Sequence, residues 1–338
     1  MNIPFEYTVG LIAIVSFVLT FIALPPLIRK LNNRGFKSQD MNKEHKPLVA
    51  KFGGIAVFLG FLVAFLLPLQ LSPQQIAVNV LLVAALSISL IAFLGFADDV
   101  LSIPDIYRVL LPLFAALPLM LLKVGTDTMA LPFIGTVNLD FGSIMLPFIG
   151  AVGLNMYVLI LIPIGVVACS NLVNLLAGFN GLEAGQGIII SLFLIALLML
   201  GGLDANKVTM VFLLIALIGA LAAFMLFNWY PAKVFPGNIV TYLIGATVAV
   251  VVIVGNVERA GAILLAPQII EFFLKALSKF KAENFGTCVN GKLTYKGATH
   301  SLTHLIMKAM KPTETQLVLV LYVLQIVAGM LAIASMRI

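Results

Sequence analysis

Long apolar stretches alternate with short polar connections along the whole sequence. Each stretch approaches the roughly 20 residues that an α-helix needs to cross a bilayer. The stretches lie at residues 8–28, 52–69, 76–96, 109–123, 144–168, 186–202, 208–227, 237–256, 260–277 and 315–335. The ninth is the least regular, because it carries Glu271 and Lys275. The pattern predicts an all-α, polytopic membrane protein with about ten transmembrane helices, built as a single domain over residues 1–338.

The composition supports a lipid environment. Hydrophobic residues make up 62% of the 338 positions and charged residues only 10%, whereas soluble domains are about a quarter charged. A soluble fold could not cover so much apolar surface, so a water-soluble globular protein is excluded.

The net charge of +6 reflects the placement of the basic residues rather than a nucleic-acid surface. Of the 20 lysines and arginines, the even-numbered connections and the C-terminus hold only Lys123, Lys207, Arg259 and Arg337. Such asymmetry follows the positive-inside rule. It predicts a multi-pass protein of the cell membrane, with both termini outside, an even number of spans and cytoplasmic odd-numbered loops. No nucleic-acid partner is expected.

Two polar clusters follow the first and the third apolar stretches. Asp40 and Lys43 lie in the first loop, as a solvated pair or as part of a site. Asp98 and Asp99 end the third stretch, where each carboxylate raises the other's pKa unless a cation is near. They mark the membrane boundary in one interpretation, and handle a divalent cation or a proton in the other.

A third cluster contains three asparagines and two glycines between residues 171 and 183. Asn171 and Asn174 would share one helix face. A helix end with an Asn/Gly turn explains Asn180 and Gly181 but not the other two. We therefore favour a polar site here, because amide oxygens suit Mg²⁺ and amide groups can read the edges of nucleobases.

The fourth cluster, residues 227–238, contains the only tryptophan. Trp229 and Tyr230 fit an aromatic belt at the membrane interface. Phe235, followed by Pro236 and Gly237, fits a rigid turn beside a base-stacking pocket.

The cytoplasmic loop at 278–313 is rich in lysine and histidine. His300 and His304 are one helical turn apart, but no glutamate follows the first as in a zinc helix, so a metal site is not expected. A basic lid over an anionic substrate and a merely solvated hairpin are both open interpretations.

Taken together and in this order, Asp40-Met-Asn-Lys43, Ala-Asp98-Asp99-Val, the 171–183 cluster and Asn228-Trp-Tyr-Pro-x-x-Val-Phe235-x-Gly237 resemble the polyprenyl-phosphate N-acetylhexosamine-1-phosphate transferases. The similarity covers most of the chain and is greatest to the eukaryotic and archaeal branch that acts on dolichyl phosphate. Members of that family have ten spans and a cytosolic active site.

The resemblance implies a reaction, a cofactor and site residues. UDP-N-acetylglucosamine and dolichyl (polyprenyl) phosphate would give UMP and N-acetylglucosaminyl-diphosphodolichol, the first step of lipid-linked N-glycan assembly. Mg²⁺, with Mn²⁺ as an alternative, would be the cofactor. The implied catalytic residues are Asp98, Asp99, Lys43 and Arg108. The implied substrate-binding residues are Gly178, Asn180, Glu183 and Phe235, with Lys279 and Lys281 in a looser alignment. The implied metal ligands are Asn174 and Asn238. The partners would otherwise be membrane lipid and, as a further expectation, a second copy in a homodimer.

One departure concerns the metal. The second ligand in the family is an aspartate, where this chain has Asn238. An amide oxygen brings no charge, so the affinity for Mg²⁺ should fall unless Asp98 or Asp99 compensates. Three rival interpretations remain: a secondary transporter or lipid flippase, a related transferase acting on another UDP-sugar, and a catalytically silent subunit.

Overall fold

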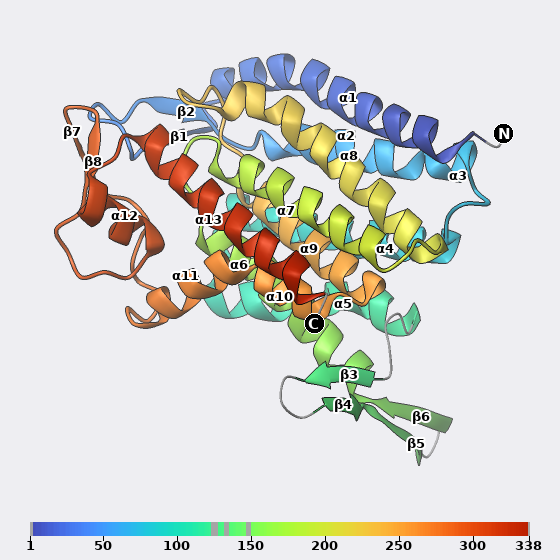
Figure 1. Ribbon diagram of the computed structural model, residues 1–338. Helices are drawn as coiled ribbons and strands as arrows, with labels where there is room; N and C mark the ends of the chain where they lie inside the picture. The colour runs from blue at the N-terminus through green and yellow to red at the C-terminus, as the bar shows by residue number, and fades with distance from the viewer. Residues whose placement is uncertain (1–2, 123–127, 132–134, 147–149, 337–338) are drawn as a thin grey trace.

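The computed structural model describes residues 3–122, 128–131, 135–146 and 150–336, and its fold is a bundle of long helices (Figure 1). Within these residues, 8 helices are long and apolar enough to cross a membrane. They are Phe5–Asn33 (α1), Gly54–Leu71 (α2 Gly54–Leu66 and α3 Pro68–Leu71), Val78–Leu101 (α4), Tyr157–Leu175 (a π-helical turn, Tyr157–Leu161, and α6 Ile162–Leu175), Leu182–Leu200 (α7), Ala205–Asn228 (α8), Asn238–Gly255 (α9) and Glu314–Ser335 (α13). The prediction of a polytopic membrane protein is therefore confirmed.

The two remaining predicted spans are irregular. Helix α5 (Asp105–Leu122) is apolar but shorter than the eight. Stretch 260–277 is broken into α10 (Glu258–Leu264) and α11 (Ala266–Ala276). Proline at position 267 lies in the first turn of α11, where its missing N–H is tolerated and a new helix begins readily.

The break is stabilised from α13. The Nε2 of Gln325 donates a hydrogen bond of 2.7 Å to the carbonyl of Leu264, the last residue of α10, and Gln268 Nε2 donates to Gln325 Oε1 at 2.8 Å. We expect Gln325→Leu to lower the free energy of unfolding by about 1–2 kcal/mol, because both groups lose a buried partner. Thermal unfolding in detergent measures this, with the exposed Gln70→Leu as control; equal melting temperatures would contradict it.

The prediction of an all-α fold is wrong in detail, because the described part of the chain contains four two-stranded antiparallel hairpins between its helices. They pair β1 (Lys37–Gln39) with β2 (Leu48–Ala50), β3 (Thr128–Leu131) with β4 (Gly135–Asn138), β5 (Asp140–Leu146) with β6 (Gly150–Asn155), and β7 (Thr287–Val289) with β8 (Lys292–Thr294).

The predicted span 144–168 is wrong in its first half. Its first residues belong to β5 and β6, and the helix begins only at Tyr157. Residues 147–149 lie outside the described part of the chain. Short apolar runs bounded by glycine and asparagine do not distinguish strand from helix by hydropathy alone. Here Gly142, Gly150 and Asn155 supply the boundaries.

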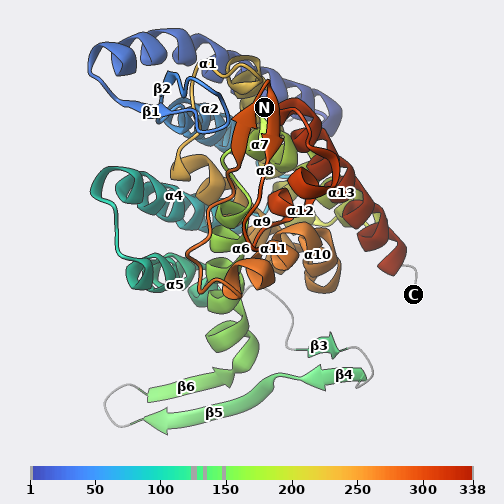
Figure 2. The same cartoon turned by 90° about the vertical axis from the view of Figure 1, so that its left-hand side faces the viewer.

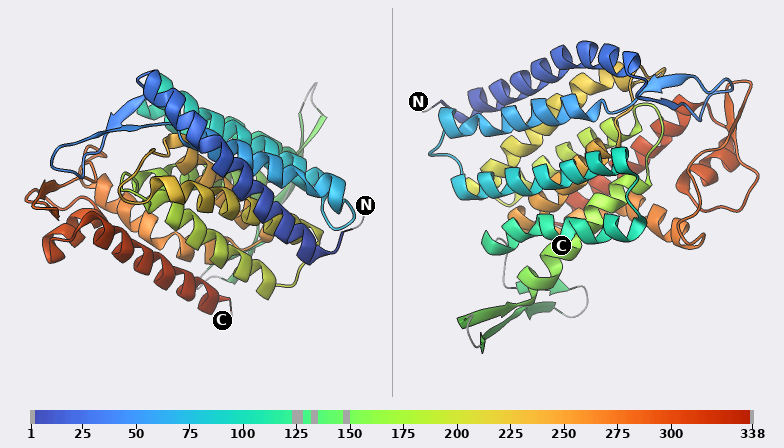
Figure 3. Two further views of the ribbon diagram at one scale, coloured as in Figure 1. Left: turned by 90° about the horizontal axis from the view of Figure 1, so that it is seen from above. Right: turned by 180° about the vertical axis from the view of Figure 1, so that it is seen from behind.

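Helix α9 forms the centre of the bundle. In its 18-residue apolar window 89% of the residues are buried, against 22% for α1 at the edge. It packs against α4 and α6, and α1 packs against α8 (Figures 1 and 3). Glycine at position 95 brings α4 and α9 together: a Cβ there would lie 2.7 Å from the carbonyl oxygen of Asn238. The ends of α4 and α9 are therefore held in backbone contact.

One end of the bundle carries β1–β2, β7–β8 and the short helix α12 (Leu302–Met310) (Figures 1 and 2). Strands β3–β6 lie away from that end and extend from the bundle beside α5 and α6. Helix α1 runs away from the N-terminus towards β1, and α13 runs from α12 to the C-terminus. Both termini therefore point away from the end with β1–β2 and α12. Lys123 and Arg337, counted above on the outer side, lie outside the described residues.

Candidate active site

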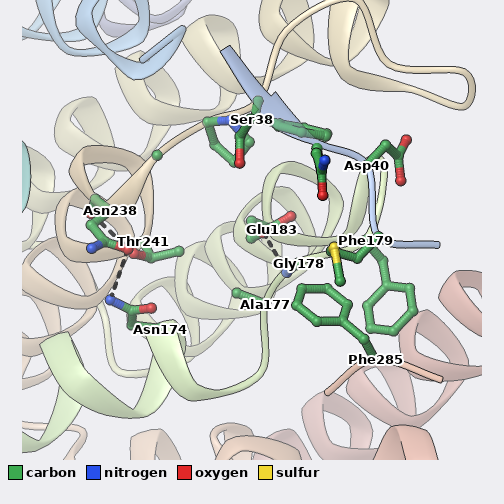
Figure 4. A pocket seen from close by; sticks show the side chains of 15 residues that line it. Ser38, Asp40, Asn174, Ala177, Gly178, Phe179, Glu183, Asn238, Thr241 and Phe285 are labelled. Atoms are coloured by element: carbon green, nitrogen blue, oxygen red, sulfur yellow. Dashed lines mark hydrogen bonds between the residues drawn. The ribbon is translucent and has the colours of Figure 1, made fainter. Parts of the chain in front are cut away.

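A pocket opens at the end of the bundle that carries β1–β2 (Figure 4). Its volume is about 300 Å³. Its walls come from segments far apart in the sequence: residues 38–41, the end of α6 and the turn after it, Glu183, residues 235–241 and Phe285. Asn174, Asn238 and Thr241 form a polar end, and Phe179 and Phe285 an aromatic end (Figure 4).

The polar end brings both predicted metal ligands and both aspartates together. Asn174 Nδ2 donates to Asn238 Oδ1 at 3.2 Å, and Asn238 Nδ2 donates to Asp98 Oδ2 at 2.8 Å. The backbone N–H of Asn238 donates to Asp99 Oδ2 at 2.6 Å. Four side chains from α4, α6 and α9 thus lie next to one another, although their motifs are far apart in the sequence.

Asp99 acts as a cap supplied by another helix. It accepts from the first N–H of α9, where unpaired N–H groups and the helix dipole favour negative charge. Gly237 precedes this N–H with φ of +74°, a conformation that favours glycine, and a Cβ there would lie 2.5 Å from Asp99 Oδ2. The positively polarised end of α9 therefore faces the pocket.

The two aspartates differ in their surroundings. Asp98 is 3% exposed, and its Oδ1 accepts from Arg108 Nε at 2.9 Å and from the backbone N–H of Ile103 at 3.0 Å. With Oδ2 bound to Asn238, both of its oxygens are occupied. Asp99 is only partly buried, so it is the more accessible carboxylate to a substrate.

The turn after α6 forms the middle of the pocket. Gly178 has φ of +105°, and its N–H donates to Glu183 Oε1 at 2.8 Å. Both residues line the pocket, as does Phe235. Phe235 is fixed by backbone hydrogen bonds with Ala50 at 2.8 Å and Gly53 at 3.0 Å. Three of the four predicted nucleotide-binding residues therefore line one pocket.

Asn180, the fourth, is buried behind this turn, 3% exposed, and does not line the pocket. Its Nδ2 donates to Asp40 Oδ2 at 3.2 Å, and its Oδ1 accepts from the Ala232 N–H at 2.8 Å. Its own N–H donates to Glu314 Oε1 at 2.8 Å. Asn180 thus joins the first loop, the turn after α8 and the start of α13.

Lys43 belongs to the same network rather than to the group around Asp99. Its ammonium forms ion pairs with Glu314 and, at 3.2 Å, with Asp40, and it lies 4.1 Å from the centre of the Tyr230 ring. Glu314 carries no signal in the sequence, because a carboxylate in the first turn of a helix is ordinary. The role of Glu314 becomes visible in the structure, where it bonds to Lys43, which is 271 positions away in the sequence.

Asn171, predicted to belong to a polar site, instead bonds to backbone carbonyls of α6 and α5. Its Nδ2 donates to the carbonyl of Val167 at 2.9 Å and to that of Arg108 at 3.5 Å. It does not line the pocket.

The basic residues of segment 278–313 do not line the pocket either. Lys279 and Lys281 are exposed after α11. His304 is stacked on Tyr295, with ring centres 3.6 Å apart. Burial lowers the pKa of His304 to about 4, and the nearby positive charges of His300 and Lys308 act in the same direction. At neutral pH His304 is therefore uncharged and cannot hold an anion as a cation would.

Within the described residues, no three His, Cys, Asp or Glu side chains gather as a metal ion would require. A cation in the pocket would depend on carboxylate and amide oxygens together. Those oxygens, from Asp98, Asp99, Asn174 and Asn238, are the hard donors that Mg²⁺ prefers.

The protein is a multi-pass membrane protein, because its fold is a bundle of long apolar helices. Its candidate active site is a polar pocket at one end of that bundle. The sequence pattern of glycosyl transferase family 4 matches residues 81–256, from α4 to α9, and the chain belongs to this family. The resemblance inferred from the motifs is confirmed.

Individual relatives extend the similarity over nearly the whole chain. A Saccharolobus solfataricus protein, provisionally named UDP-N-acetylglucosamine–dolichyl-phosphate N-acetylglucosaminephosphotransferase, is 36% identical over 95% of this chain and 94% of its own. A Sulfolobus acidocaldarius protein with the same provisional name is 37% identical over 95% and 94%. The Dictyostelium discoideum protein of that name is 26% identical over 75% of this chain and 68% of its own.

Proposed function

We propose that this chain transfers N-acetylglucosamine 1-phosphate from UDP-N-acetylglucosamine to dolichyl phosphate or a related polyprenyl phosphate, releasing UMP. The product, N-acetylglucosaminyl-diphosphodolichol, would begin the assembly of a lipid-linked oligosaccharide for N-glycosylation. The observation that carries the proposal is a pocket at the end of an apolar bundle, lined by Asn174, Asn238 and Phe235. Asp98 and Asp99 stand directly behind its polar end, where both bond to Asn238. The names of the relatives supply the substrates.

The reaction needs positioning and charge neutralisation more than covalent chemistry. An oxygen of the lipid phosphate attacks the β-phosphorus of the UDP-sugar. The bond from that phosphorus to the bridging oxygen breaks, and UMP leaves with the bridging oxygen. A phosphate monoester has a second pKa of about 6, so most of the acceptor is already a dianion at neutral pH. Asp99 orients the acceptor and takes the proton from the remaining monoanion.

The diphosphate carries negative charge that the pocket must balance. Arg108 forms an ion pair with Asp98 and lines a small separate cavity behind the pocket. The first N–H groups of α9 add partial positive charge at the pocket itself. The hard oxygen donors of Asp98, Asp99, Asn174 and Asn238 would hold Mg²⁺. When bound, Mg²⁺ neutralises the charge that develops on the diphosphate oxygens.

The pocket's position suits two substrates of opposite solubility. By the positive-inside rule, the basic loops favour a cytoplasmic location for this end of the bundle. A UDP-sugar arrives there from water, while the polyprenyl tail stays in lipid and only its phosphate reaches the interface. A transporter would need a substrate site near the middle of the bilayer that opens to each side in turn. The pocket described here lies instead at one end of the bundle.

Release of UMP tests the proposal. The purified protein is incubated with UDP-N-acetylglucosamine, dolichyl phosphate and Mg²⁺, with one component omitted in each control and EDTA added in another. We expect UMP only in the complete mixture, with EDTA lowering the rate at least a hundredfold because the diphosphate charge is then unbalanced. UMP formed without the lipid phosphate would indicate hydrolysis, and no UMP in any mixture would overturn the proposal.

A further inference from the structure

Segment 278–313 reaches the pocket through an aromatic ring rather than through its lysines. Phe285 is the residue of this segment that lines the pocket among the described residues. A Cβ added to Gly178 would lie 2.9 Å from the Phe285 ring, and the ring centre of Phe179 is 6.1 Å away. Phe285 therefore covers the Gly178 turn and forms part of the aromatic end of the pocket (Figure 4).

The preceding residue fixes this ring. Asn284 Nδ2 donates to the carbonyls of Leu175 at 2.9 Å and Ala177 at 2.7 Å. Leu175 is the last residue of α6 and Ala177 lies in the turn after it, where a helix leaves its last C=O groups without partners. Asn284 thus caps α6 from more than 100 residues away, between the predicted metal ligand Asn174 and the pocket residue Gly178.

Asn284 is itself held in place. It is 6% exposed, and its backbone carbonyl accepts from Thr303 Oγ1 at 2.7 Å. Ser301 Oγ lies 3.4 Å from Asn284 Oδ1 and donates to Glu271 Oε2 at 3.1 Å. Glu271 also accepts from the N–H of Leu302 at 2.8 Å. The start of α12 and the middle of α11 therefore lock the Asn284 side chain onto α6.

We propose that Phe285 is a nucleotide-binding residue that packs on the planar base, and that Asn284 is the positioning residue that presents it. This inference rests on the proposed function, because it names a contact of the same substrate. An aromatic ring is a favourable surface for a base, which offers a flat π-face whatever its edge. Phe235 lines the same pocket, so the base would have two aromatic neighbours from separate segments.

Binding of UMP and of UDP-N-acetylglucosamine to the full-length protein, measured by calorimetry in detergent with Mg²⁺, tests the contact. Phe285→Leu keeps an apolar side chain but removes the ring, so we expect about fivefold weaker binding of both ligands. Phe285→Tyr keeps the ring and should stay within about twofold of the wild type. Val289→Ala, an exposed change in β7 of the same segment, is the control.

The two ligands separate a base contact from a sugar contact. Weaker binding of UDP-N-acetylglucosamine with unchanged binding of UMP would place Phe285 on the sugar and overturn the inference. Unchanged binding of both ligands to Phe285→Leu would overturn it as well.

The role of Asn284 is tested by a double-mutant cycle. Asn284→Ala should weaken UMP binding about as much as Phe285→Leu, while kcat at saturating substrate changes less than twofold. The double variant should lose no more than either single variant, because both changes remove the same contact. Losses that multiply would mean that Asn284 acts independently of Phe285 and would overturn its assignment.

The failure of this inference can be distinguished from failure of the proposed function. Binding of both nucleotides without UMP release would refute the transfer reaction and leave the cycle interpretable. UMP release with unaltered binding to Phe285→Leu would refute only the role of Phe285.

Discussion

Replacing Asp99 by asparagine will lower the rate of UMP formation at least a hundredfold and leave the affinity for the UDP-sugar within about threefold. The reason is the position of the carboxylate, which caps the first N–H of α9 and is the more accessible of the two aspartates. Asparagine keeps the shape and the accepting oxygen but loses the charge that receives a proton or a cation. A preorganised group that orients the reacting phosphate and balances charge contributes about 10²–10³-fold to the rate, and proton transfer from the monoanion adds to this.

The measurement is a steady-state assay of UMP release together with calorimetric binding of UDP-N-acetylglucosamine. Asp140→Asn, the same chemical change in the exposed hairpin β5–β6, serves as control and should have no effect. Equal losses of turnover and of affinity in Asp99→Asn would contradict the assignment and indicate a structural or purely metal-binding role.

Replacing Asn238 by aspartate will lower the Mg²⁺ concentration for half-maximal activity at least tenfold. The Asn238 amide now donates to Asp98 Oδ2 at 2.8 Å, so the substitution replaces a donor with a second carboxylate at hydrogen-bonding distance. Two carboxylates so close repel each other, and a divalent cation relieves the repulsion while gaining a charged ligand.

A Mg²⁺ titration of UMP release gives the half-saturating concentration, and thermal unfolding gives an independent reading. Without Mg²⁺ the Asn238→Asp protein should melt at a lower temperature than the wild type, and Mg²⁺ should restore it. Asn256→Asp makes the same change at the opposite end of α9 and should leave the response of both quantities to Mg²⁺ unchanged. A Mg²⁺ dependence like that of the wild type would exclude Asn238 as a ligand.

The membrane spans could be predicted because helix length in a bilayer is set by its thickness. Hydropathy found the eight long helices, but it could not separate the strands around Gly150 from a helix, since both are apolar. The break before Pro267 was hidden for a different reason. The Leu264 carbonyl at the break is bonded by Gln325, which belongs to another helix.

The site divides in a similar way. Four site residues could be predicted because each is a polar side chain at the end of an apolar span, where a polar group is costly and therefore indicates a function. They are Asp98, Asp99, Asn174 and Asn238. Glu314 and Asn284 could not, because each resembles an ordinary cap or loop residue in the sequence. Their importance comes from contacts with residues more than 100 positions away, which no local pattern encodes.

The ion pair between Lys43 and Glu314 has a consequence for how the protein is made. The first loop leaves the ribosome long before α13, yet Asn180 and Lys43 reach their shared partner only when α13 is in the membrane. A nascent chain with the earlier helices inserted would therefore hold an unfinished pocket. The proposed nucleotide pocket would therefore be completed only at the end of synthesis, when Glu314 reaches its two partners.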